Sequence, residues 1–217
     1  MTIDAMIGRD PAPDCELCPR LVEFRDRNRQ RFPGYFNGAV AGFGDEAPWL
    51  LIVGLAPGLH GANRTGRPFT GDYAGDLLYE TLDTFGLSRG TYAKEADDGL
   101  SLVGCRISNA VHCVPPENKP TPAEANTCRV FLDREIRKNP NLKAMIALGT
   151  IAHNAVLSIL GMRKALYPFG HGRVHPLPAG LPTLIDSYHC SRYNTNTRRL
   201  TPEMFHDVFR TAVTFKP

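Results

Sequence analysis

The sequence contains no long hydrophobic segment, and its charge is nearly balanced. No apolar run approaches the roughly 18 residues that a membrane-spanning helix needs. Met1–Cys15 has no apolar stretch behind a basic start, so we expect a cytoplasmic protein rather than a secreted one. The 25 Lys and Arg against 22 Asp and Glu leave a net charge of +3, too small to identify a polyanionic partner. At 217 residues and 42% hydrophobic content, we predict one monomeric domain, 1–217, whose core needs no disulfides.

The two common glycine-rich phosphate-binding motifs are also missing. The segment 54–72 is rich in glycine and lies between a predicted strand and a predicted helix, but no Gly-Lys-Ser/Thr closes it and Gly-x-Gly-x-x-Gly never occurs. Its glycines permit close approach of a ligand to the backbone. Phe69 offers a flat apolar surface for stacking on a base, or is simply a core residue under the loop. Asp72 is most simply explained as the N-cap of the following helix.

Short apolar runs alternate with helical patterns along the chain. We predict strands at 49–54, 107–113, 144–149 and 184–188, and helices at 72–85, 121–138, 150–160 and 201–213. This alternation predicts an α/β fold, a three-layer α/β/α sandwich around a four-stranded parallel sheet, with residues 1–48 wrapped around it. Ligands of such sheets bind beyond the carboxyl ends of the strands, where the loops 54–71, 109–119 and 189–197 should meet.

The six cysteines include one pair, Cys15 and Cys18, separated by two residues. In a cytosolic chain this spacing indicates a metal site or a redox pair rather than a structural disulfide. We expect Cys113 and Cys128 to complete a set of four thiolates. The alternatives for this second pair are Cys105 and Cys190. Four thiolates without a suitably spaced histidine fit zinc or a [4Fe–4S] cluster, and the wide spacing of the second pair favours iron–sulfur.

Basic residues concentrate in the second half of the chain. Residues 163–199 contain six Lys and Arg and one acidic residue, whereas 41–100 contains nine acidic residues and four basic ones. A basic face near the C-terminal half suits a phosphate backbone. A solvated surface without any partner has the same composition.

Three long motifs resemble those of the iron–sulfur uracil-DNA glycosylases. They lie at 54–72, 109–120 and 189–201, and the opening Cys-x-x-Cys with the following Arg-Leu-Val is similar to the start of that family. The resemblance covers nearly the whole chain in the right order. It implies a four-stranded parallel sheet between helices and a [4Fe–4S] cluster with Cys113 among its ligands. It also implies a repair enzyme that flips uracil out of double-stranded or single-stranded DNA and hydrolyses its N-glycosidic bond.

The resemblance also implies roles for individual residues. Asn109 would contact the edge of the base, His189 would donate a hydrogen bond to the leaving base, and Asp72 would stabilise the sugar cation or orient water. The expected pocket residues are Gly54, Ala56, Gly58, His60, Asn63, Arg64 and Phe69. The expected DNA contacts are Arg67, Arg192, Tyr193, Asn194, Asn196, Arg198 and Arg199.

One position departs from the uracil-only branch of the family. Leu55 stands where that branch usually has an acidic residue, and a leucine cannot polarise water. The Gly-Leu-Ala-Pro-Gly sequence resembles instead the broader branch called type B or family five, which implies activity on other deaminated bases such as hypoxanthine. Two other functions fit parts of the sequence: an iron–sulfur redox protein, and an inactive nucleic-acid-binding protein on the same scaffold.

Overall fold

The computed structural model describes residues 8–217, so part of the Met1–Cys15 segment lies outside the described residues. Its centre is a parallel sheet of four strands, in the order β5 (Cys105–Asn109), β2 (Leu50–Gly54), β6 (Ala144–Leu148) and β8 (Thr183–Ser187). Every residue of β2, β5 and β6 is buried. This burial explains why β2 and β6 read as continuous apolar runs. Strand β5 contains Arg106, Ser108 and Asn109, and it spans Cys105–Asn109 instead of the expected 107–113.

The sheet has six strands rather than the four expected. The antiparallel strands β1 (Phe43–Gly44) and β7 (Val174–His175) extend the two edges beside β5 and β8. Each has only two residues, too few for a period-two pattern to be visible in the sequence. The parallel centre and the layered α/β class agree with the prediction.

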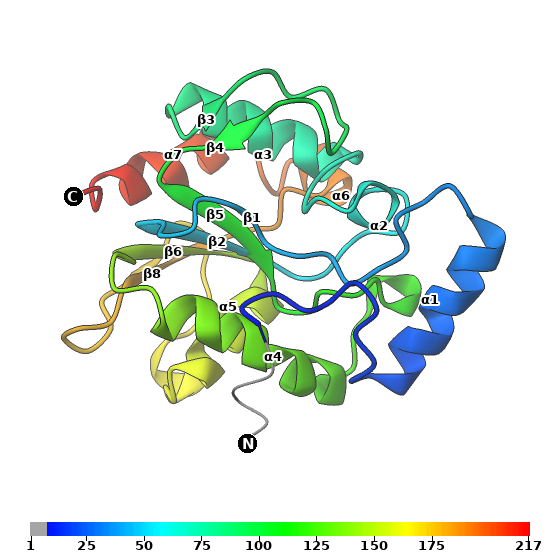
Figure 1. The fold of residues 1–217 in the computed structure, drawn as a ribbon. Coiled ribbons are helices and arrows are strands. Elements are labelled where there is room, and N and C mark those ends of the chain that lie inside the picture. Colours follow the sequence, from blue (N-terminus) through cyan, green and yellow to red (C-terminus); the bar gives the residue numbers. More distant parts are fainter. Residues whose placement is uncertain (1–7) are drawn as a thin grey trace.

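Helices cover both faces of the sheet (Figure 1). One layer contains α3 (Tyr73–Thr84) and α7 (Pro202–Val213), and the other contains α4 (Pro122–Arg137) and α5 (Thr150–Ile159). Side chains cap three of these four helices: Asp72 caps α3, Thr121 caps α4 in a capping box, and Thr201 caps α7. Helix α5 begins at Thr150 after Gly149 and has no side-chain cap.

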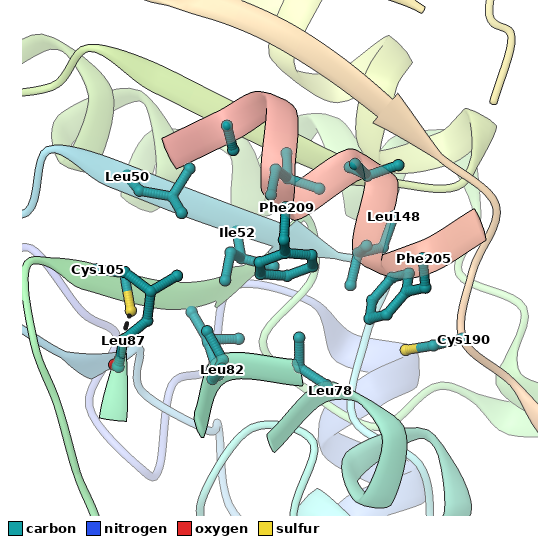
Figure 2. Packing of buried hydrophobic residues seen from close by; sticks show 14 of the residues in the cluster. Leu50, Ile52, Leu78, Leu82, Leu87, Cys105, Leu148, Cys190, Phe205 and Phe209 are labelled. Carbon is teal, nitrogen blue, oxygen red and sulfur yellow. Dashed lines mark hydrogen bonds between the residues drawn. The ribbon is translucent and has the colours of Figure 1, made fainter. Parts of the chain in front are cut away.

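Figure 2 shows the larger of the two core layers. Phe205 and Phe209 of α7 pack with Leu78 and Leu82 of α3 above the face of β2 that carries Ile52. Each of these side chains is fully buried, which contributes roughly 1.5–3 kcal/mol per side chain. The layer holds α3 and α7 in place, and both helices begin at the carboxyl-end edge of the sheet.

Several further elements were not visible in the sequence. They are α1 (Pro19–Arg31), α2 (Ala62–Thr65), the hairpin of β3 (Ser88–Arg89) with β4 (Ser101–Leu102), η2 (Pro116–Asn118), η3 (Lys164–Leu166) and α6 (Arg192–Asn196). Helix α1 lies at one side of the sheet, as Figure 1 shows, and Leu21 packs against Val111 and Phe131. Within residues 8–217, no helix is both long enough and apolar enough to cross a membrane.

Candidate active site

A pocket opens beyond the carboxyl ends of the parallel strands. Six of its lining residues are among the site residues expected from the sequence: Ala56, Gly58, His60, Asp72, His189 and Arg192. Leu55, the residue that departs from the uracil-only pattern, also lines it. Sequence reasoning gave no role to the five other lining residues, Gly71, Tyr73, Ala74, Asn118 and Ser191. Of these, Asn118 has a positive φ of 56°, which asparagine tolerates better than most residues.

Next to this pocket, the side chains of Asn109 and Phe69 lie close above Gly54. A Cβ at this glycine would lie 2.3 Å from Asn109 Oδ1 and 2.7 Å from the Phe69 ring, so only glycine leaves room for both side chains. The Asn109 side chain is 2% exposed, and its Oδ1 has no hydrogen-bond partner among the described residues. A buried acceptor without a partner costs roughly 1–3 kcal/mol. The unpartnered amide oxygen therefore lowers the stability of the fold and is free to accept a hydrogen bond from a ligand.

Phe69 and His189 face one another. Their ring centroids are 5.7 Å apart at an interplanar angle of 26°. Phe69 is buried and has a positive φ of 53°, a strained backbone for a bulky residue. Phe69 therefore belongs to the core, as the simpler interpretation held, and still presents its ring to His189.

Burial lowers the pKa of His189 to about 4. The imidazole is therefore neutral at neutral pH and carries one N–H donor. On the backbone side, the His189 carbonyl accepts a hydrogen bond of 2.8 Å from the Asn194 amide. The segment is thus fixed while the ring faces the pocket.

Asp72 combines a helix cap with a place in the pocket wall. Its Oδ1 accepts a hydrogen bond of 3.2 Å from the Gly75 N–H, as the N-cap interpretation predicts. Its Oδ2 lies against two backbones without side chains, since a Cβ would approach it to 3.2 Å at Gly58 and 2.3 Å at Gly61. Burial raises the pKa of Asp72, which the N-terminal amides of α3 partly oppose. The cap and a second role are compatible because the two oxygens have different surroundings.

Two expected contacts are not supported by the structure. Arg67 is 4% exposed and forms two hydrogen bonds of 2.7 Å with Asp98, so it stabilises the loop instead of reaching DNA. Asn63 is 1% exposed and donates to Asn37 Oδ1 at 2.9 Å, beneath the loop rather than in the pocket. A third residue, Asn194, is half-buried and donates to the His189 carbonyl, and its contact with DNA stays a prediction.

The other expected DNA contacts lie at the surface beside the pocket. Exposed side chains of α6 and the following turn are Arg192, Tyr193, Asn196, Arg198 and Arg199. Tyr193 is 72% exposed, an unusual position for a large aromatic residue. At the other rim, His60 Nδ1 lies 3.1 Å from the Tyr35 hydroxyl, and Arg64 pairs with Glu95 at 2.9 Å.

The structure gathers four cysteines around a second, apolar pocket. Cys15 and Cys18 precede α1, Cys113 follows β5, and Cys128 belongs to α4. Burial and, to a smaller extent, the neighbouring thiols raise the pKa values of Cys113 and Cys128 to about 12. The two alternative cysteines lie elsewhere, in the core layer of α3 and α7, where they donate to the carbonyls of Leu87 and Ala74.

Four thiols around one apolar pocket are a ligand set that suits zinc or an iron–sulfur cluster.

Comparison with known proteins identifies the family. A family model described as the uracil DNA glycosylase superfamily matches residues 41–212. The chain belongs to this superfamily. It is 47% identical over 203 residues to a Thermus thermophilus protein named type-5 uracil-DNA glycosylase, an alignment that covers 91% of this chain and 92% of that one.

Other relatives carry the same name. The chain is 45% identical over 206 residues to a type-5 uracil-DNA glycosylase of Mycobacterium tuberculosis, covering 91% of this chain and 76% of the relative. A type-5 uracil-DNA glycosylase of Pyrobaculum aerophilum is 40% identical over 203 residues, covering 92% and 88%. The predicted resemblance to the family-five branch is confirmed.

Proposed function

We propose that this protein is a DNA repair glycosylase that flips uracil out of DNA and hydrolyses its N-glycosidic bond, leaving an abasic site. The names of its relatives support this reaction. The observation that carries it is the unpartnered amide oxygen of Asn109, buried above Gly54 beside the facing rings of Phe69 and His189. An amide offers both a donor and an acceptor, which the Watson–Crick edge of uracil complements.

Recognition begins with extrusion of the nucleotide, which costs a few kcal/mol and costs least for a mismatched base. The flipped base stacks on Phe69, and Asn109 reads its edge. The neutral His189 then donates a hydrogen bond to a carbonyl oxygen of the base. Because negative charge develops on the departing base, this donor binds the transition state more strongly than the substrate.

Asp72 acts on the other fragment of the reaction. The sugar gains positive charge as the bond breaks, and the Asp72 carboxylate stabilises that charge and orients a water molecule. Leu55 lines the same pocket but offers no polar atom, so Asp72 is the carboxylate available in this wall. The burial that raises its pKa also strengthens this role, because a desolvated carboxylate interacts more strongly with a nearby cation.

The exposed residues of α6 and the turn after it would hold the DNA. Arg198 and Arg199 neutralise phosphates, while Tyr193 enters the duplex near the flipped nucleotide. Double-stranded DNA is the main substrate in this proposal.

The four-cysteine pocket would hold a [4Fe–4S] cluster. Four thiols in an apolar lining, supplied by three separate segments of the chain, support this assignment. The cluster would supply cross-links between the segment before α1, the loop after β5 and α4, and we assign it no step of the reaction. Raised thiol pKa values oppose thiolates in the empty pocket, so cluster assembly and folding of this region should be coupled.

The reaction is tested with an end-labelled duplex containing one uracil opposite guanine, treated with alkali after incubation. The native protein should produce a single break at the uracil, and His189→Ala should cut it about 10²- to 10³-fold more slowly in single-turnover conditions, the usual scale for one oxyanion-type donor. Binding without any break would indicate the inactive nucleic-acid-binding alternative. A protein that neither binds nor cuts the duplex would instead fit the iron–sulfur redox function.

The substrate range follows from Leu55. A pocket that stabilises the leaving base and the sugar, with no second acid to aim the water, can serve several good leaving groups. We therefore expect breaks in duplexes containing hypoxanthine or xanthine as well. Efficient cleavage of uracil with none at these two bases would contradict the inference from Leu55.

The cluster is tested by colour and metal content. Protein purified without air should be brown with broad absorption near roughly 400 nm. Replacing Cys113 or Cys128 with alanine should remove the colour, whereas Cys105→Ala, the matched control from the other core layer, should keep it. Stoichiometric zinc without iron would overturn the assignment.

A further inference from the structure

A second group of polar side chains lies behind the pocket, under the segment that presents His189. The centre of this group is Asp186 of β8, which is completely buried. Its Oδ1 lies 2.7 Å from His153 Nδ1, and its Oδ2 lies 2.8 Å from His175 Nε2. The other nitrogen of His153 faces the Tyr167 carbonyl at 2.8 Å. None of these groups lines the pocket, and the proposed reaction uses none of them.

Asp186 also fixes the backbone on both sides of His171. The Gly170 N–H donates to Asp186 Oδ2 at 3.1 Å, and the Gly172 N–H donates to the Asp186 carbonyl at 2.8 Å. His171 is thereby held between two bonds to one residue of β8. Its side chain has little freedom to move away from that strand.

His171 contacts Tyr188, the residue immediately before His189. Its Nδ1 accepts a hydrogen bond of 3.1 Å from the Tyr188 N–H, and the two rings stack with centroids 4.9 Å apart at an angle of 14°. The Arg199 guanidinium lies over the same Tyr188 ring, 4.5 Å from its centroid. Tyr188 therefore links an exposed arginine, a buried strand and the pocket histidine.

We propose that His171 is a positioning residue, which aims His189 at the leaving base by fixing the backbone of Tyr188. His189 is then held from both sides, by His171 before it and by Asn194, which donates to its carbonyl. The benefit is preorganisation: a hydrogen-bond donor to a developing charge works only when it is aimed before the reaction, and a displacement of about 1 Å can cost 10²-fold in rate. This inference rests on the proposed glycosylase activity.

The test uses three substitutions. His171→Phe keeps a ring to stack on Tyr188 but removes the acceptor, and His171→Ala removes both. His171→Asn restores an acceptor oxygen near the position of Nδ1. Tyr188→Phe is the matched control, because it keeps the ring and the backbone N–H. Each variant is measured for single-turnover cleavage of a uracil duplex, for its Kd toward a duplex carrying uncleavable 2′-fluoro-deoxyuridine, and for its unfolding temperature.

We expect cleavage by His171→Phe and His171→Ala to fall by about 10- to 100-fold. The Kd of both should stay within about threefold of the native value, and His171→Asn and Tyr188→Phe should cleave within about threefold of the native rate. If His171→Phe does not fold, the comparison of Ala with Asn decides in the same way.

Two results would overturn the proposal. One is native-like cleavage by His171→Phe or His171→Ala. The other is a loss of rate that follows the loss of unfolding temperature in every variant, with no rescue by asparagine. A native protein that does not cleave uracil would instead remove the proposed function itself, so the two failures are distinguishable.

Discussion

Two groups of polar side chains, one around Asp186 of β8 and one at the pocket, are built in opposite ways. Around Asp186, each carboxylate oxygen has at least one donor, and both nitrogens of His153 face an acceptor. At the pocket, Asn109 Oδ1 has no partner, and burial shifts the pKa values of Asp72 and His189 toward their neutral forms. A satisfied network stabilises the fold, whereas unsatisfied groups cost stability and bind a ligand. The group around Asp186 therefore supports the site, whereas Asp72, Asn109 and His189 take part in the proposed reaction.

The largest expected effect on stability concerns the satisfied network. Asp186→Ala should lower the free energy of unfolding by about 3–5 kcal/mol, because it leaves buried histidine nitrogens without their acceptor. Chemical denaturation measures this change. Asp83→Ala, a matched control at an exposed position on α3, should change it by less than about 0.5 kcal/mol. Native-like stability of Asp186→Ala would show that the network is not structural.

Asp72→Asn should have the opposite signature, a large loss of rate without a loss of stability. Asparagine caps a helix about as well as aspartate, so the helix start is kept while the charge is removed. We expect single-turnover cleavage of uracil to fall by about 10²- to 10³-fold. Full activity would leave the cap as the only role of Asp72.

The pH dependence gives Asp72 a second test. Its pKa is raised in the folded state, so the folded chain binds more protons than the unfolded one between the two pKa values, and stability falls as the pH rises through that window. Asp72→Asn removes this loss and should be at least as stable as the native protein at neutral pH. The native rate should fall on the acid side as the carboxylate is protonated, at a pH above the ordinary aspartate range. A less stable Asp72→Asn protein would contradict this electrostatic account.

The smallest expected effect concerns the exposed arginines. Arg198→Ala should weaken DNA binding similarly for all sequences and reduce the slope of log affinity against log salt by about one contact. Arg210→Ala, a matched control near the end of α7 where the side chain pairs with Asp207, should leave the slope unchanged. An unchanged slope in Arg198→Ala would place the phosphate contacts elsewhere.

The sequence predicted the parts of the fold that depend on local patterns. The strands β2 and β6 and the helices of both layers were visible as apolar runs, periodic patterns and capping residues, and the motifs led to Asp72, Asn109 and His189. Strand β5 was placed four residues too late at its end because Arg106 and Ser108 interrupt its apolar pattern. The edge strands were missed because two residues carry no period. The burial of Arg67 was missed because its partner, Asp98, lies 31 residues away in a loop without a pattern. The cofactor, the cytoplasmic location and the monomeric state stay predictions.

The supporting network was invisible for a related reason. His153, His175 and Asp186 come from α5, β7 and β8, and only the folded sheet brings them together. In the sequence, His171 and His175 lie within the basic stretch 163–199, which gives no sign of their roles. Their roles depend on hydrogen bonds to β8, which no spacing along the chain reveals.

The most direct test of the account is the substitution Asn109→Leu, with stability and cleavage measured on the same preparation. Leucine has nearly the shape of asparagine and removes an acceptor that has no partner. Ser108→Ala is the matched control, because Ser108 Oγ is also buried without a partner but belongs to the neighbouring position of β5, which points to the other face. The account predicts that both variants are at least as stable as the native protein, that Ser108→Ala cleaves uracil normally, and that Asn109→Leu cleaves it at least 10²-fold more slowly. An Asn109→Leu protein that loses stability but keeps the native rate would contradict it.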